Sequence, residues 1–419
     1  MKAEKMIWLV GLLLLALPAM AQETDDDDKE GGLLSHVDRV IDKFHSNNVD
    51  TNYIMLPKQP WQVSVKSRVA QTDLLMYSTI DGGAVYGPIL AGTGLEIVGP
   101  LQIRPRVMTP VSTSVGVKVG YRGVSASYTM PVGGGDKGRS LSLRSLGKFY
   151  SIHLRYRQFE EKSPEQEGIV HIKGLPVEAA SMMGFVPGPV DAATGAQEYS
   201  IGGGWDLKSP IKIKTLVFDG FYIFNYKRFS YGAAYNQKTI QKRSAGSFIA
   251  GVMAYYADLK FNNSSNGELI TYMGGIGRIR QWQGSVGGGY AYNYVPAKGW
   301  LIGATAMPMV TFVNQMKMDR YSSDFVEKTT QEMREQSIVD FYNSADGEYT
   351  LKHEEGITHN NRMTVNFTAR LSVTYNWSRY FVNVNGQFNN FHYSHKSSKN
   401  HMHGHLNDWY VNAAVGVRL

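Results

Sequence analysis

The chain has 419 residues, of which 12% are aromatic, and it contains 25 Tyr, 44 Gly and no Cys. Without cysteine it has no disulfide framework and no thiolate metal site, and its single long apolar run excludes a bundle of membrane-spanning helices. The net charge of +7 is spread along the chain and forms no basic block, so we expect no nucleic-acid partner. We also expect no cofactor.

The first 21 residues predict a secretory signal peptide. Lys2 and Lys5 precede an apolar stretch over residues 6–17, and Ala19-Met20-Ala21 forms a cleavage site of the A-x-A kind. A single membrane anchor is the alternative, but the apolar stretch is short for a membrane span. We therefore expect export of the chain, with cleavage near Ala21.

Residues 22–60 predict an acidic leader followed by a short helix. Residues 25–29 read DDDDK, which resembles an engineered protease tag, although a natural acidic leader fits a chain with a signal peptide equally well. In LLSHVDRVIDKF, residues 33–44, apolar side chains recur at helical spacing. We expect an amphipathic helix on the periplasmic side of the following domain, or, as the alternative, at a membrane interface.

From Trp61 onward the apolar residues recur with a period of two, which predicts β-strands. Apolar and polar side chains alternate over residues 61–70, 114–121 and 149–158. A turn at Arg122-Gly123 connects the second of these segments to a further strand and predicts a hairpin. We expect residues 61–419 to form one β-domain.

The C-terminal half contains the longest alternating segments. Residues 363–377 and 380–389 each carry an apolar row opposite a row of Thr, Asn, Gln, Ser and Arg side chains. Both segments are long enough to cross a bilayer at a tilt. In the last segment, residues 408–419, the apolar row continues to Leu419, and lipid would cover it.

Two architectures fit alternating strands in an exported protein. In a soluble sandwich or barrel the apolar rows face inward, whereas in a membrane barrel they face lipid. The uninterrupted polar rows, together with aromatic residues near strand ends such as Trp377 and Tyr380, favour a polar lumen and an aromatic girdle. We predict an all-β transmembrane antiparallel β-barrel of about 12 strands (range about 10–14) in the outer membrane of a Gram-negative bacterium.

The lengths of the connections predict which side of the membrane each one faces, because such barrels have short periplasmic turns and long outer loops. The predicted short turns are 122–123, 296–299 and 378–379. The predicted outer loops are 133–147, 262–279, 314–361 and 392–407. One connection conflicts with this scheme: residues 160–210, rich in Pro, Gly and acidic residues, would fall on the periplasmic side. Either that segment holds two further strands or the strand count is wrong by two.

The segment YIFNYKRFSYGAAYNQKTIQKRSAGSFIAG, residues 222–251, resembles the signature of an uncharacterised outer-membrane barrel family of Bacteroidota, of the type RFSY…AYNQ…QKRSAGS. Residues 50–54, DTNYI, provide a second point of similarity. The resemblance implies an outer-membrane barrel and no particular activity. The chain differs from the commonest ending of outer-membrane barrels, because Leu419 replaces a terminal aromatic residue.

The same segment has an unusual density of side chains that form hydrogen bonds, between two apolar strands. If these side chains face the lumen, they form a polar plug or bind an anionic group. The alternative is a periplasmic turn in which Lys and Arg are simply hydrated. Together with one inward-facing arginine of a later strand, the candidate lumen or anion-binding residues are Arg228, Gln237, Gln241, Lys242, Arg243 and Arg370.

Five of the eleven histidines lie in HYSHKSSKNHMHGH, residues 392–405. Neutral imidazoles bind Zn or Cu, which makes His401, His403 and His405 weak metal candidates, but a solvated outer loop is the preferred interpretation. His392 and Ser394 also resemble the histidine and serine of outer-membrane lipid hydrolases. They are minor catalytic candidates, because the sequence shows neither a third group to orient the imidazole nor an oxyanion donor.

Three functions remain open on this basis. The first is a narrow or plugged pore that transports small or anionic molecules, since about 12 strands enclose only a narrow lumen. The second is a non-conducting scaffold subunit that binds envelope proteins through the outer loops 314–361 and 392–407. The third is a lipid hydrolase. We expect the protein not to be an enzyme and to contact outer-membrane lipid.

Overall fold

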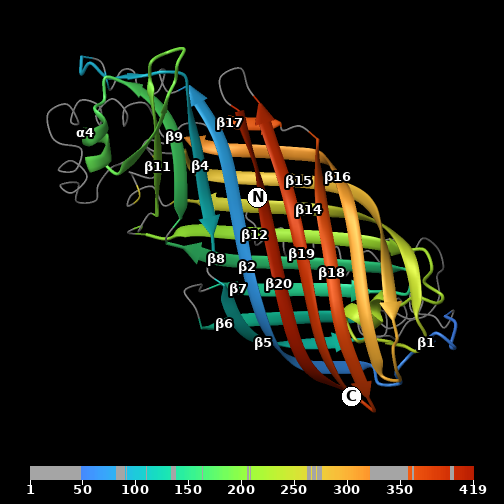
Figure 1. Ribbon diagram of the computed structural model, residues 1–419. Coiled ribbons are helices and arrows are strands. Elements are labelled where there is room, and N and C mark those ends of the chain that lie inside the picture. Colours follow the sequence, from blue (N-terminus) through green and yellow to red (C-terminus); the bar gives the residue numbers. More distant parts are fainter. Residues whose placement is uncertain are drawn as a thin grey trace, which may run out of the picture.

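The computed structural model describes residues 49–81, 90, 92–109, 111–133, 138–162, 164–204, 207, 209–261, 266, 270, 276–320, 357–360, 363–396 and 401–419. These residues form a closed antiparallel β-barrel with a small lobe at one end (Figure 1). The predicted signal peptide and the predicted helix over residues 33–44 lie outside the described residues.

Twelve strands close the barrel, as the sequence predicts. In the order in which they neighbour one another, they are β2 (Trp61–Asp81), β5 (Ser112–Tyr121), β6 (Val124–Gly133), β7 (Arg139–Leu146), β8 (Tyr150–Glu161), β12 (Ile211–Ile223), β14 (Ala245–Lys260), β15 (Ile276–Tyr294), β16 (Trp300–Arg320), β18 (Thr364–Trp377), β19 (Tyr380–Lys396) and β20 (His401–Arg418).

The barrel closes through β2, which pairs with β20 along nearly its whole length. On its other side, the first half of β2 pairs with β5 and the second half with β4 (Pro100–Met108). β2 is therefore longer than its barrel partner β5, and its far half continues into the lobe.

All three predicted short turns lie at one end of the barrel, the end where the C-terminus lies in Figure 1. All three contain a residue with a left-handed backbone, with φ of 44° at Arg122, 85° at Gly299 and 51° at Ser378. Because outer-membrane barrels have short turns on the periplasmic side, this is the periplasmic end.

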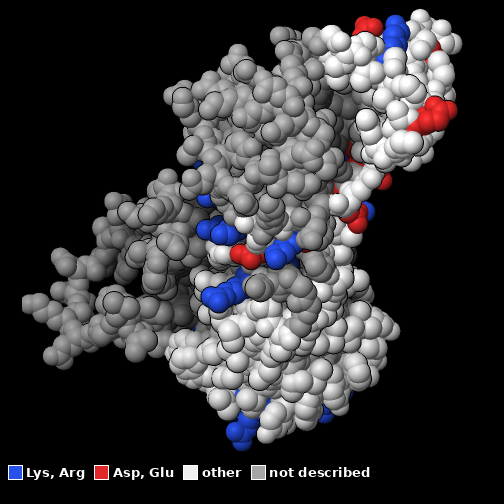
Figure 2. Space-filling model, turned by 90° about the vertical axis from the view of Figure 1, so that its left-hand side faces the viewer, with Lys and Arg blue, Asp and Glu red and all other residues white. Residues whose placement is uncertain are grey.

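The outer face of the barrel is apolar and its inner face on β18 is polar. Val365 and Leu371 expose 58% and 65% of their surface outward, whereas Asn366 and Thr374, in the alternate row, are 1% and 0% exposed. On one side of the molecule, a broad surface without charged side chains separates Lys and Arg at the periplasmic end from a charged group farther up (Figure 2). The rows therefore face lipid, and the soluble sandwich is excluded.

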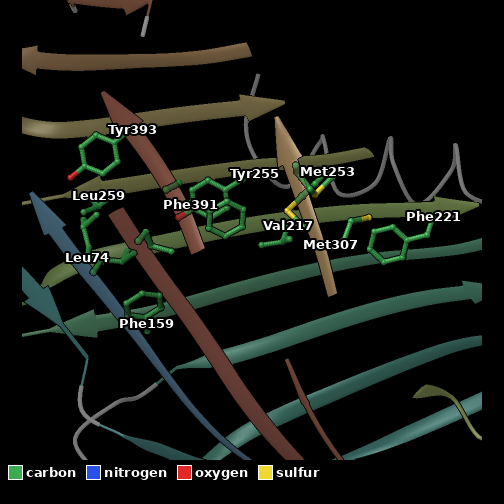
Figure 3. Packing of buried hydrophobic residues seen from close by; sticks show 14 of the residues in the cluster. Leu74, Phe159, Val217, Phe221, Met253, Tyr255, Leu259, Met307, Phe391 and Tyr393 are labelled. Carbon is green, nitrogen blue, oxygen red and sulfur yellow. The ribbon is translucent and has the colours of Figure 1, made fainter. Parts of the chain in front are cut away.

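The inner face is not polar throughout, which corrects the prediction of a uniformly polar lumen. Inward-facing side chains of β12, β14 and β16 pack as a buried apolar cluster (Figure 3). We call this set the apolar wall; its main members are Val217, Phe221, Ile249, Met253, Tyr255, Met307 and Met309. Small barrels fill their interior with side chains, so strands with apolar residues on both faces are compatible with this fold.

The predicted outer loop 133–147 is wrong, because it contains strand β7. Polar and apolar residues alternate in β7, but the glycines that flank it resemble loop sequence. With β7 counted as a strand, each connection from β7 to β12 lies on the opposite side of the membrane from the one predicted. Residues 160–210 therefore lie at the outer end of the barrel, with the long loops, and the conflict in the predicted topology disappears.

Residues 160–210 form most of the lobe. A sheet of β3 (Glu96–Ile97), β4, β9 (Glu165–Lys173), β11 (Gln197–Gly204) and β10 (Phe185–Val190) extends from the far half of β2. The helix α4 (Val177–Met182) packs against it, and Tyr199 lies at the centre of a small separate core. The segment thus contains three strands, and not the two further strands of the first alternative; they lie outside the barrel, so the barrel count of twelve is unchanged.

Three further predicted loops begin or end within strands. The predicted loop 262–279 ends within β15, which starts at Ile276. β19 runs to Lys396 and β20 starts at His401, so most of the predicted loop 392–407 is a strand pair. β16 likewise extends to Arg320, and β17 (Ile357–Asn360) pairs with its end. The strands are longer than predicted because their histidines and charged residues lie beyond the lipid-facing band, where polarity does not oppose strand pairing.

A second, two-stranded sheet lies at the periplasmic end. It pairs β1 (Ile54–Met55) with β13 (Ile240–Gln241), next to the short helix α5 (Tyr231–Tyr235). No helix in the described part of the chain is long and apolar enough to cross a membrane.

Candidate functional site

Residues 224–244, between β12 and β14, fold back into the periplasmic end of the barrel. We call this segment the plug. All five residues of α5 are buried, and so are Asn236 and Gln237 after it. The central part of the segment is therefore a buried plug, and of the polar residues predicted in this segment Gln237 and Gln241 are buried in it.

Gln241 holds the plug in its shape. Its side-chain oxygen accepts a hydrogen bond from the backbone N–H of Ser230 at 2.9 Å and one from Asn293 of β15 at 3.1 Å. Its amide nitrogen donates to the carbonyls of Arg228 at 2.6 Å and Arg243 at 3.0 Å. Ser230 in turn caps α5, because its hydroxyl accepts from the N–H of Ala233.

The apolar wall and the adjoining part of β16 contact the helix of the plug. A Cβ placed on Gly303 of β16 would lie 2.7 Å from the Cβ of Ala234, so only glycine allows this approach. The Tyr231 ring meets Phe221 edge-on at 6.1 Å, and the Tyr235 hydroxyl lies 3.1 Å from the Thr305 hydroxyl.

Three of the predicted lumen residues instead lie where the plug meets the N-terminal segment. Arg228 is exposed and its Nε lies 3.7 Å from a carboxylate oxygen of Asp50. Lys242 donates from its Nζ to the Thr51 carbonyl at 2.9 Å, and Arg243 stacks over the Tyr53 ring. These residues connect DTNYI to the plug.

Above the plug lies a polar cavity of about 60 Å³, which we call the cationic chamber. Its volume accommodates a few water molecules or a small anion. Four cationic side chains line it, and the remaining lining is mostly Ser, Asn, Gln and Tyr. The four are Lys66 and Arg68 of β2, Lys118 of β5 and Arg144 of β7.

The four cations donate hydrogen bonds to uncharged oxygens. Lys66 reaches the Ser127 hydroxyl at 2.7 Å and Arg68 the Ser140 hydroxyl at 2.9 Å. Within the described part of the chain none of the four forms an ion pair, and no carboxylate lines the chamber. Buried cations without counter-ions are costly, so the chamber is a site of unbalanced positive charge.

Carboxylates do balance several other buried arginines of the lumen. Arg370 of β18 lies 2.9 Å from Asp219 of β12, which also contacts His153 at 3.2 Å. Farther outward, Asp408 pairs with Arg155. Of the predicted lumen residues, Arg370 therefore faces the lumen as expected, but its guanidinium already pairs with the Asp219 carboxylate.

The C-terminal end of α5 separates the chamber from the periplasm. Asn236 and Gln237 line both the chamber and a larger periplasmic pocket of about 240 Å³. Lys118 donates to the Asn236 carbonyl at 3.0 Å, Arg144 to that of Tyr235 at 2.5 Å, and Arg418 to that of Gln237 at 3.1 Å. Cationic side chains of the barrel therefore hold the carbonyl groups of the plug.

The chamber residues were within reach of sequence reasoning but were not identified. Lys66 and Arg68 lie two apart in the polar row of the first strand, and Lys118 lies in the polar row of the next. Collecting the cations of the inward rows would have found them. Arg144 was hidden because its strand was predicted as loop.

Burial also affects one ionisable group of the plug outside the barrel strands. Lys238 donates from its Nζ to the Leu146 carbonyl at 3.2 Å. Removal from water lowers the pKa of Lys238 to about 7. The charge of Lys238, with the plug in the barrel, is therefore sensitive to pH near neutrality.

The histidine and serine candidates lie in strands, at the outer ends of β19 and β20, and not in a loop. His392 places its Nδ1 2.9 Å from the Val365 carbonyl, and its ring centre lies 6.1 Å from that of His405, directly across on β20. Ser394 is opposite His403, whose ring stacks on Tyr77, and His401 pairs in register with Lys396. Within the described residues there is no group of three potential metal ligands.

Solved outer-membrane barrels resemble the chain only distantly. The outer membrane protease OmpT from Escherichia coli is 6% identical, with a TM-score of 0.31 over 85% of this chain and 97% of that one. The translocator domain of the autotransporter NalP from Neisseria meningitidis is 8% identical, with a TM-score of 0.27 over 92% and 96% of the two chains. Comparison with curated protein sequences gives no match.

A family model matches residues 206–418, which extend from just before β12 through the plug to the end of β20. The matched range includes the segment 222–251, whose role as a family signature and whose assignment to Bacteroidota both stay predictions. Since the match covers just over half of the residues, the chain belongs to the family described as a domain of unknown function, DUF4421.

Proposed function

We propose that this outer-membrane β-barrel is a plugged transport protein for small anionic solutes. The observation that carries the proposal is the cationic chamber, in which Lys66, Arg68, Lys118 and Arg144 surround a polar cavity without a carboxylate in its lining. Rings of Lys and Arg are the lining that anion-selective pores use. A bound anion would offset the cost of burying this charge.

Transport requires the plug to move, because the buried helix α5 and the residues that follow it separate the chamber from the periplasm. The proposal connects solute and plug through shared partners. Lys118 and Arg144 already donate to plug carbonyls, and an anion in the chamber would compete for the same donors. Hydrogen bonds between ionic partners are stronger than those from a cation to a neutral carbonyl, so binding favours release of the plug.

The test is ion selectivity in planar bilayers, with the double variant Lys66→Gln/Lys118→Gln compared with the unchanged protein. We expect channel events that prefer chloride to potassium in the unchanged protein and lose that preference in the variant. Lys58→Gln/Lys298→Gln, which removes the same charge from exposed periplasmic positions, is the matched control and should retain selectivity.

Liposome swelling supplies a second readout, with gluconate as the anionic probe and a neutral sugar of similar size. Faster swelling in gluconate supports anion transport. A barrel that conducts neither solute, even when the plug is displaced by the Gly303→Leu variant described below, would refute the transport function and favour a scaffold.

A further inference from the structure

The outer surface of the barrel carries a second cluster of cations, separate from the lumen. It lies at the outer ends of β12, β14, β15 and β16, on the lipid-facing side of these strands. We call it the outer basic patch; it consists of Lys212, Lys214, Lys260, Arg278, Arg280 and Lys317, with Asp258 and Asp319 between them.

Strand register arranges these residues as two adjacent rows. In one row, Lys214, Asp258, Arg280 and Lys317 are neighbours across the four strands. In the row beyond it, the neighbours are Lys212, Lys260, Arg278 and Asp319. Because neighbouring strands lie about 4.8 Å apart, the patch spans about 15 Å.

The two carboxylates pair with the arginines, and among the described residues none of the four lysines forms an ion pair. Arg278 forms a bidentate pair with Asp258, with both contacts at 2.7 Å, and Arg280 contacts Asp319 at 2.5 Å. Lys212 and Lys260 face each other directly across β12 and β14, an arrangement that is destabilising in a sheet unless an anion offsets it. On the flanking strand β8, Glu160 lies opposite Lys212 and reduces the excess charge without removing it.

The position of the patch identifies the kind of anion. The row directly beneath it on the membrane side contains Tyr256 and Trp282, whose ring centres lie 4.2 Å apart. Such aromatic pairs mark the level of the membrane interface in β-barrels. In the view of Figure 2, Lys and Arg side chains gather around acidic ones just above the broad uncharged surface. The patch is therefore at the height of lipid head groups on the outer side.

We propose that the outer basic patch binds the phosphate groups of an anionic glycolipid of the outer leaflet. Several phosphates on one head group match several lysines spread over about 15 Å, and each contact replaces repulsion between lysines with attraction. A soluble anion has no reason to bind at this depth, beside aromatic residues that face lipid. This proposal is independent of whether the lumen conducts.

The experiment measures binding by the full-length protein in detergent, using native mass spectrometry. The probes are diphosphoryl lipid A, phosphatidylcholine of similar acyl content, and inorganic phosphate. The unchanged protein should bind diphosphoryl lipid A at least tenfold more tightly than phosphatidylcholine. The variant Lys212→Gln/Lys260→Gln/Lys317→Gln should lose at least tenfold in affinity for the phosphorylated lipid.

The control removes three exposed lysines from the periplasmic end, in the variant Lys58→Gln/Lys227→Gln/Lys298→Gln. It changes net charge by the same amount and should alter affinity by less than twofold. Equal binding by the patch variant and the unchanged protein would overturn the proposal. So would an equal loss in the control, or displacement of the lipid by inorganic phosphate at an equivalent phosphate concentration.

Discussion

The apolar wall and the cationic chamber hold different parts of the same plug by different forces. Along the wall, Phe221 packs on Tyr231 and Gly303 admits Ala234, so contact depends on shape and excluded water. At the chamber, Lys118 and Arg144 donate hydrogen bonds to carbonyls of the segment that follows. No solute can replace a packed ring, whereas an anion can take over a hydrogen-bond donor.

The two parts of the plug therefore have different roles. Packing against the apolar wall positions α5 in the barrel, and the exchangeable contacts at its C-terminal end respond to what enters the chamber. Each hydrogen bond from a charged donor contributes about 1.5–3 kcal/mol, so exchanging two or three of them is enough to shift a two-state equilibrium.

The largest effect is expected where the two regions meet, at Arg370. Replacing Arg370 with Met leaves Asp219 buried with only His153 as a partner, and removing one member of a buried pair costs about 3–5 kcal/mol. We expect Arg370→Met to lower the free energy of unfolding in urea by that amount. Arg228→Met, at an exposed pair, should change it by less than about 1 kcal/mol.

A double variant distinguishes loss of the pair from loss of packing. If the unpaired charge of Asp219 is the cause, adding Asp219→Leu to Arg370→Met should restore part of the stability. No recovery would mean that the guanidinium acts mainly by packing on Phe221 and Tyr231.

The next effect tests the wall alone. Leucine at Gly303 would collide with Ala234 and Ser372, and overpacking costs about 1–3 kcal/mol. We expect Gly303→Leu to displace the plug and to raise the conductance in planar bilayers. The matched control is Gly288→Leu on β15, an exposed position where an added Cβ would meet only the Ile249 carbonyl oxygen, at an ordinary contact distance of 3.7 Å. Conductance equal to that of the unchanged protein would show that the wall does not hold the plug.

The effect that is smallest over any single pH unit concerns pH itself and is carried by Lys238. In the closed state its pKa is about 7, whereas a plug released into water would have the ordinary value near 10.5. Between these values the released state binds more protons, so closure is favoured as pH rises and weakened as pH falls toward 7. The change is at most about 1.4 kcal/mol per pH unit.

We therefore expect the open probability to rise as pH is lowered from about 10 to about 7, and to change little below that. Lys238→Met has no titrating group at this position and should remove this dependence. Open probability that still rises in Lys238→Met would assign the effect to another group.

Alternation along the chain by itself determined the outer surface of this protein. On β18, Val365 and Leu371 face lipid and Asn366 faces inward as predicted, because a period of two permits only two faces and lipid accepts only the apolar one. The short turns and the strand number were equally local properties. The same local reasoning failed at β7, where flanking glycines concealed a strand and altered the predicted side of residues 160–210.

What the interior contains was decided only by the tertiary structure. Nothing local distinguishes inward Met253 and Met307 from lipid-facing residues, since both faces of those strands are apolar. Likewise Lys66, Lys118 and Arg144 lie far apart in the sequence, and the pairing of β2, β5, β6 and β7 brings them to one side of the lumen, where the plug completes the chamber. A polar segment such as the plug is soluble in water by composition, and it becomes buried because the closed barrel supplies the donors and the space that satisfy it.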